Sequence, residues 1–329
     1  MLRRDFIKVV GGFAATSLVP ATSSAQQTGR VAKVGILTSG NHLSSPTIEK
    51  FRRELRDVGY VEGHDLVIEF RSSALAPATL QDLATELVQA RVDVLVADSN
   101  VSVVAAKLAS TTIPIVAILG VDPVATGLIA SYARPGGNIT GFTLLAPELG
   151  TKRLEILKET VPGLRRVGVL WNSINAVNAT PQVRALADAA RGLGLEVVTT
   201  TVQHRDELTE AFSRLKAQGA GAVMTLADAM LFGERKRVAD AALAVKLPGM
   251  FPERPFADAG GLLSYGPDVL DTFKRVAGHV DRILKGAKAA DLPFEQPARF
   301  EFAINLKTAQ ALGLTVPPTL LTRADEVIE

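Results

Sequence analysis

The sequence predicts an α/β protein built from two similar, doubly wound lobes that the chain joins by three crossings. Short apolar segments alternate with segments of helical periodicity, which is typical of a parallel sheet covered by helices on both faces. Four features of the first half also return in the same order about 130 residues later, which indicates an internal duplication. Two such lobes would leave a cleft between them.

The duplication is clearest at the start of each half. Residues 33–37 form a short apolar segment that enters a polar loop, and residues 166–170 repeat this pattern. A helix ended by glycine and followed by a strand comes next in both halves, at Gly59 and at Gly194. The alternative is chance repetition, because βα units are common; the shared order and spacing favour duplication.

The alternation places strands in the first lobe near 33–37, 65–70, 93–97, 114–118 and 139–142. The second lobe is expected to begin with a helix at 148–160 and a strand at 166–170. The remaining chain predicts a helix at 269–286, a strand at 300–304 and a short helix at 306–312. These segments are too small to form a third domain, so we expect them to add to the two lobes.

The expected crossings lie near residues 142, 266 and 298. They divide the chain into a first lobe of 31–141 plus 266–297 and a second lobe of 142–265 plus 298–329.

Residues 1–25 predict an export signal. Arg3 and Arg4 give a basic start, an apolar stretch of about 11 residues follows, and Ser23, Ser24 and Ala25 offer a small-residue cleavage site. The start resembles a twin-arginine signal, while Leu2 leaves the general secretory route open. The stretch is far shorter than the roughly 20 residues that span a bilayer, so we expect a soluble periplasmic protein.

Composition excludes several functions. The 329 residues are 47% apolar, enough for two cores, and contain no cysteine. Without cysteine there is no disulfide, no thiol nucleophile and no lipid anchor through that residue. The formal charge is +2, and the predicted signal supplies all of it, so nothing favours a nucleic-acid partner.

Ligands of open parallel sheets bind beyond the carboxyl ends of the strands. This rule selects side chains that follow predicted strands in both lobes. The first lobe gives Thr38, Ser39, Asp98, Ser99, Asn100 and Asp122, and the second gives Trp171, Asn172 and Asp228, with Tyr265 at the return crossing.

Each candidate also has a structural interpretation. Asp98 and Asp122 can cap the helices that follow them, as Ser45 and Thr180 are expected to do. The single tryptophan, Trp171, can stack on a ligand ring or pack in the core. Asp228 and Tyr265 can hold a cationic group and a ligand edge, or bond to each other across a hinge.

Catalytic motifs are absent from the sequence. The four histidines, His42, His64, His204 and His279, lack metal spacing and are expected at the surface, and there is no nucleophile elbow or phosphate loop. We expect no metal and no cofactor. An enzyme that uses Asp98 and Asp228 as acid and base, and an exported sensor for a membrane receptor, are the alternatives to a binding protein.

Four segments carry a resemblance to a known family. They are Asp-Pro-Val-Ala-Thr-Gly-Leu at 122–128, Arg-Pro-Gly-Gly-Asn-Ile-Thr-Gly at 134–141, Gly-Gly-Leu-Leu-Ser-Tyr-Gly-Pro at 260–267 and Ile-Asn-Leu-Lys-Thr-Ala at 304–309. The chain resembles the ABC-transporter substrate-binding proteins that include tryptophan and tyrosine binders. The resemblance implies the type I periplasmic-binding fold.

It also implies a function. By resemblance the protein is the monomeric, non-enzymatic solute-binding component of an ABC importer and delivers an aromatic amino acid, or a related aromatic or carboxylate compound, to an inner-membrane permease. Thr38, Ser39, Ser99 and Asn100 would bind the ligand carboxylate, and Asp228 the amine. The chain departs from the family pattern at 98–101 and 252–256, which puts the identity of the ligand in doubt.

Overall fold

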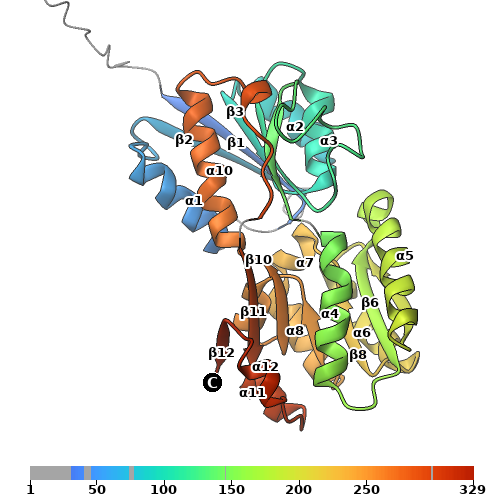
Figure 1. The fold of residues 1–329 in the computed structure, drawn as a ribbon. Helices are drawn as coiled ribbons and strands as arrows, with labels where there is room; N and C mark the ends of the chain where they lie inside the picture. Colours follow the sequence, from blue (N-terminus) through green and yellow to red (C-terminus); the bar gives the residue numbers. More distant parts are fainter. Residues whose placement is uncertain (1–30, 41–45, 74–77, 145, 298) are drawn as a thin grey trace, which may run out of the picture. The chain divides into compact units, whose positions relative to one another are not determined.

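The computed structural model describes residues 31–40, 46–73, 78–144, 146–297 and 299–329. Val31–Glu329 forms one compact unit. Two α/β sheets make up its framework (Figure 1). The predicted export signal lies outside the described residues.

The first sheet contains five parallel strands in the order β2-β1-β3-β4-β5. They are β1 (Ala32–Thr38), β2 (Leu66–Ser72), β3 (Val94–Ala97), β4 (Ile115–Leu119) and β5 (Ile139–Thr143). Along β3, Val94 and Val96 pack with α1 (Pro46–Asp57) and α10 (Val269–Leu284). Leu95 and Ala97 pack on the opposite face with α2 (Leu80–Gln89) and α3 (Asn100–Ala109). The lobe is therefore doubly wound, as the apolar runs predicted.

The second sheet repeats this strand order and extends it. Its order is β7-β6-β8-β9-β10-β11-β12, so the first five strands reproduce the 2-1-3-4-5 pattern of the first sheet. The strands are β6 (Arg166–Asn172), β7 (Glu196–Val202), β8 (Ala222–Thr225), β9 (Gly249–Phe251), β10 (Leu263–Pro267), β11 (Phe300–Asn305) and β12 (Glu326–Ile328). Among the strand pairs of the described residues, only β10 and β11 run antiparallel. The topology agrees with the duplication that the sequence indicates.

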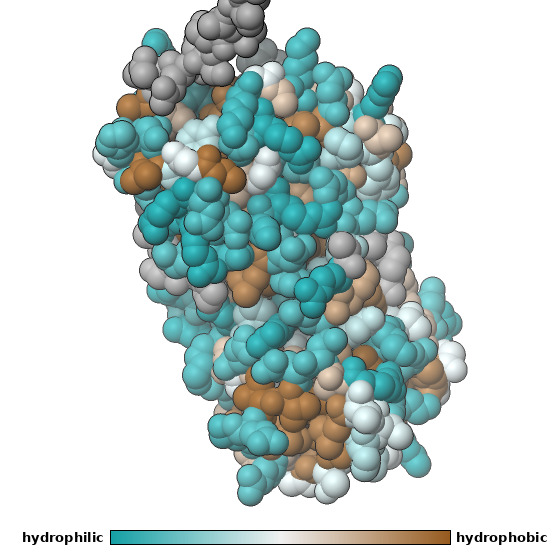
Figure 2. Space-filling model, turned by 60° about the vertical axis from the view of Figure 1, so that its left-hand side comes forward, coloured by the Kyte–Doolittle hydropathy of each residue, from teal (hydrophilic) through white to brown (hydrophobic). Residues whose placement is uncertain are grey.

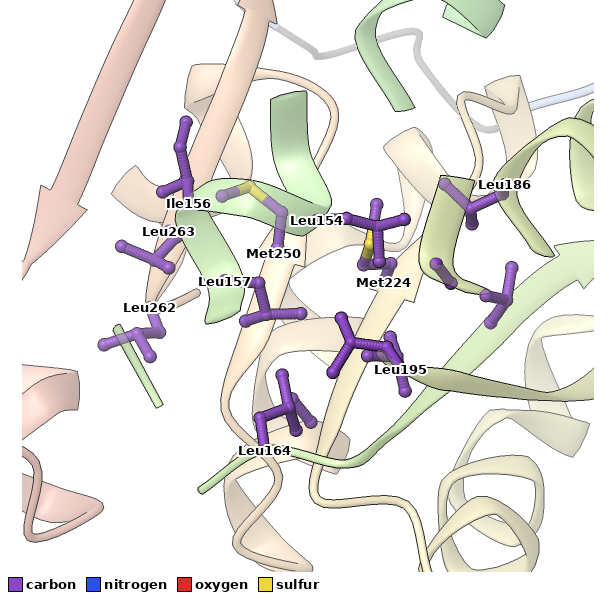
Figure 3. Close-up of a cluster of buried hydrophobic side chains, with 14 of the residues drawn as sticks. Leu154, Ile156, Leu157, Leu164, Leu186, Leu195, Met224, Met250, Leu262 and Leu263 are labelled. Atoms are coloured by element: carbon purple, nitrogen blue, oxygen red, sulfur yellow. The ribbon is translucent and has the colours of Figure 1, made fainter. Parts of the chain in front are cut away.

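Helices cover both faces of the second sheet. They are α4 (Ala146–Thr160), α5 (Ala176–Gly192), α6 (Leu208–Ala217), α7 (Ala229–Gly233), α8 (Arg235–Ala244), α9 (Arg254–Asp258), α11 (Leu306–Ala311) and α12 (Pro318–Leu321). Leucines of α4 gather with Met224 of β8 and Met250 of β9 (Figure 3). Burying each such side chain contributes about 1.5–3 kcal/mol, which fixes the layer of helices on the sheet.

The chain passes between the two sheets at three places. It leaves the first sheet after β5, returns from β10 to α10, and leaves again before β11. Helix α10 lies beside α1, more than 200 residues away in sequence (Figure 1). Glu295 forms a parallel β-bridge with Phe142 of β5, so the chain is still at the first sheet at this residue. The third passage therefore comes after Glu295. The exact residue limits of the two lobes stay a prediction.

Two local predictions are wrong. His279 is buried, not at the surface, because it lies on the face of α10 that meets the sheet; its Nε2 is 3.2 Å from the Pro293 carbonyl oxygen. Thr180 is not a helix cap, because α5 begins one turn earlier at Ala176. Ser45 lies outside the described residues.

The surface view agrees with a protein whose apolar residues are mainly internal. Figure 2 shows that hydrophilic residues predominate on one face, with one group of hydrophobic residues near its lower end. Within the described parts of the chain, no helix has the length and apolar character needed to cross a membrane.

Candidate functional site

A pocket lies where strand ends of both sheets meet, as expected for parallel α/β sheets. Its empty volume is about 710 Å³, including the open solvent at its mouth. From the first sheet and its helices come Thr47, Asp98, Ser99, Asn100, Ile118, Gly120, Leu144, Val269, Thr272 and Phe273. From the second come Asn175, Ala227, Asp228, Ala229, Phe232 and Glu253.

On the side of the first sheet, the loop after β3 brings three polar residues into the pocket. Ser99 caps α3: its Oγ accepts from the Ser102 amide at 3.3 Å, and Ser39 Oγ donates to it at 3.4 Å. Asn100 Oδ1 accepts from the Gly120 amide at 3.2 Å. Helix α3 therefore begins at the pocket wall with its first residues held in place.

Asp98 adds a carboxyl group to the same wall. Burial raises its pKa to about 7 against the opposing effect of a hydrogen bond from Thr38, and the charge of Asp228 raises it further. Thr38 itself is fully buried behind this wall. The capping role considered for Asp98 belongs to the next residue, Ser99.

Asp228 faces Asp98 from the second sheet. Its Oδ1 caps α7 by accepting from the amides of Met230 at 2.9 Å and Leu231 at 3.1 Å. Asn172 donates to the same oxygen at 3.3 Å, and Asn175 donates to Oδ2. Burial raises the pKa of Asp228, while these hydrogen bonds lower it. The carboxylate is thus fixed in orientation beside the pocket.

Glu253, after β9, is a site residue that the sequence analysis missed. It is only 4% exposed, and its Oε2 has no hydrogen-bond partner among the described residues. Burial raises its pKa to about 7, against the charge of Arg153, and Asp228 raises it further. The duplication contained the signal: Asp122 was selected for following the fourth strand of the first lobe, and Glu253 follows the corresponding strand of the second.

Apolar side chains form the rest of the lining. Ile118, Leu144 and Val269 lie on the side of the first sheet with Phe273, and Phe232 lies on the other. A pocket with apolar walls and a few fixed polar groups is the usual form of a small-molecule site.

Six predicted residues are not among those that line this pocket. Three of them are hydrogen-bonded to residues that do: Thr38 to Asp98, Ser39 to Ser99 and Asn172 to Asp228. The other three are Asp122, Trp171 and Tyr265. Asp122 is exposed and accepts from the Val124 amide at 2.8 Å and from the Tyr132 hydroxyl at 3.1 Å, and these contacts lower its pKa. Trp171 packs against the core of the second sheet. The ring of Tyr265 is stacked at 6.4 Å from Phe300.

The chemistry of the pocket favours cations and hydrogen-bond donors. Three carboxyl groups line it, and the described residues of its lining include no lysine, arginine or histidine. Within the described ranges, no group of three or more His, Cys, Asp or Glu residues is arranged to hold a metal ion.

Comparisons with known proteins identify the family of the chain and its fold. Residues 33–328 match the family described as ABC transporter substrate binding protein. A tyrosine-binding protein of Clostridioides difficile is 29% identical over 283 residues, which cover 85% of this chain and 81% of that protein. A conserved domain protein of Vibrio cholerae has a similar structure, with a TM-score of 0.80 and 27% identity over 91% of this chain and all of that one.

An ABC domain from Streptococcus pneumoniae in complex with L-Trp superposes with a TM-score of 0.77. It is 25% identical and covers 90% of this chain and 99% of its own. These similarities also bear out the two-lobe type I periplasmic-binding fold. The chain belongs to the family of ABC transporter substrate-binding proteins.

Proposed function

We propose that this protein is the periplasmic solute-binding subunit of an ABC importer. It binds an amino acid, best an aromatic one, in the pocket between the two sheets. The ligand-bound protein then docks on the permease. The observation that carries the proposal is the pairing of fixed carboxyl groups with apolar walls in one pocket. Phe232 and Phe273 offer surfaces for an aromatic side chain.

The proposed contacts are those of the residues that line the pocket. The amine lies at Asp228, opposite Asp98, and the carboxylate lies at Ser99 and Asn100 where α3 begins. Ser39 and Asn172 act through Ser99 and Asp228, to which they are hydrogen-bonded, and Thr38 acts through Asp98.

A ligand held from both sides favours a closed arrangement of the lobes. Lobe limits at 141, 266 and 298 are part of the proposal, and closure occurs about these crossings. A shift from 1:99 to 99:1 in favour of the closed form requires about 5.5 kcal/mol of differential binding, so contacts with one lobe alone do not close it. The protein would first be exported to the periplasm, by the twin-arginine or the general secretory route.

A thermal-shift screen of residues 26–329 against the twenty amino acids tests the function. A ligand at 100 times its dissociation constant stabilises the protein by about 2.7 kcal/mol. We expect aromatic amino acids to give the largest shifts and mass spectrometry to recover them unchanged. No shift with any amino acid contradicts the proposed ligand class, and chemical turnover contradicts a pure binding role.

A further inference from the structure

The carboxyl group of Glu253 has no structural task within its own helix. Glu253 occupies the N-cap position of α9, where its carbonyl oxygen accepts from the Phe256 amide at 3.1 Å, but its side chain makes no capping hydrogen bond. The side chain lines the pocket instead, and Oε2 is buried without a hydrogen-bond partner among the described residues. Buried polar atoms without a partner are rare because each costs about 1–3 kcal/mol.

Arg153 does not provide the missing partner. This buried guanidinium donates from Nε to the Tyr265 carbonyl at 2.7 Å and from Nη2 to the Pro252 carbonyl at 3.3 Å. Among the described contacts, the guanidinium of Arg153 bonds to these two carbonyl groups and not to Glu253. Arg153 therefore supplies a nearby positive charge that favours an ionised Glu253, and it leaves the hydrogen-bonding capacity of Oε2 unused.

Asp228 is used differently. Its two oxygens already accept four hydrogen bonds from the protein, which hold it as an oriented negative charge suited to an ammonium group. Glu253 lines the same pocket with an unused acceptor. The two carboxyl groups therefore suit two different groups of one ligand.

We propose that the ligand carries, besides its α-ammonium group, a second hydrogen-bond donor at the end of its side chain, and that Glu253 is the residue that recognises this donor. The inference rests on the proposed function and narrows its ligand class. The donor is either the hydroxyl of a phenol, as in tyrosine, or an ammonium, as in lysine. A buried acceptor built for a donor rejects a ligand that lacks one, because the acceptor is then left unpaired.

Calorimetric titration with two matched pairs of ligands tests the proposal at pH 7.5. Tyrosine is compared with phenylalanine, and lysine with norleucine, so that each pair differs in the terminal donor. We expect the donor-bearing ligand of one pair to bind at least about 100-fold more tightly than its partner, and that pair identifies the donor. Equal affinities within a pair that binds overturn the inference while the amino-acid function stands. If none of the four ligands binds, the inference fails, whereas the proposed function fails only if the thermal-shift screen finds no amino acid that binds.

A variant then assigns the discrimination to Glu253. In Glu253→Met we expect the donor-bearing ligand to lose at least about 100-fold in affinity and the donor-free ligand to change less than threefold. A purely structural role of Glu253 as the counter-charge of Arg153 would weaken both ligands alike. The double variant Arg153→Met/Glu253→Met removes both charges and is the control for folding. If the variants do not fold, the comparison of ligand pairs on the wild-type protein still tests the proposal.

Discussion

Gly266 lies against the carbonyl group of Pro252, so close that a Cβ atom at position 266 would stand 1.7 Å from that oxygen. The ends of β9 and β10 can approach this closely only because residue 266 has no side chain. Arg153 donates to Pro252 and Tyr265 at the same place. This contact positions the segment that carries Glu253 into the pocket.

Gly266→Ala should therefore lower the free energy of unfolding by about 3 kcal/mol, because the backbone at Pro252 must move. Chemical denaturation measures the effect. Gly278→Ala is the matched control: nothing lies within 4 Å of its Cβ position in α10, and alanine should stabilise the helix by about 0.5–1 kcal/mol. Equal effects of the two substitutions would show that the contact with Pro252 is unimportant.

Asp228→Asn should weaken amino-acid binding at least tenfold, because the amide keeps the shape of the side chain but loses the charge that faces the ligand amine. Asp122→Asn provides the control, since Asp122 is an exposed cap that is not among the residues lining the pocket. Its affinity should stay within a factor of two. Titration calorimetry decides, and a larger loss in Asp122→Asn would place the site elsewhere.

Much of the fold follows from the sequence because apolar periodicity reports burial directly. The repeat of 33–37 at 166–170 became β1 and β6, which hold equivalent places in two sheets that share the order of five strands. Asp98 and Asp228, which the same rule selected, both line the pocket, because the ends of parallel strands meet at one edge. Their role in binding stays a prediction.

For other residues, a place in the pocket depends on the direction in which the side chain points, and the position along the chain does not give that direction. Trp171 precedes Asn172 in β6, and successive residues of a strand point to opposite faces. Asn172 therefore reaches Asp228 while Trp171 packs in the core. Glu253 was missed because β9 is only three residues long and the proline after it obscures the strand end.

Trp171→Phe should thus leave ligand affinity within a factor of three. The substitution keeps an aromatic ring in the core and removes an indole N–H that has no hydrogen-bond partner among the described residues. Asn175→Ala, which removes a donor to Asp228, should weaken binding at least fivefold. A loss in Trp171→Phe as large as that in Asn175→Ala would instead support stacking of the ligand on Trp171.

Stability of the ligand-free protein should depend on Glu253 between pH 4.5 and pH 7. Its pKa rises from 4.5 to about 7 on folding, so the folded state binds more protons than the unfolded state in this range. Stability therefore falls as pH rises, by roughly 3 kcal/mol across the window from this group alone.

Glu253→Gln should remove that part of the pH dependence. Denaturation of both proteins at pH 4.5 and 7.5 measures it, and the difference between them cancels the contribution of all other carboxyl groups. Identical slopes would mean that Glu253 titrates normally in the folded protein.

The central claim is that one solute is held by carboxyl groups from both sheets. Titration calorimetry of the best amino acid from the screen into the wild type, Asp98→Asn and Asp228→Asn tests it most directly. The account predicts that each substitution weakens binding at least tenfold, since Asp98 and Asp228 line the same pocket from opposite sides. Wild-type affinity in either variant would contradict it.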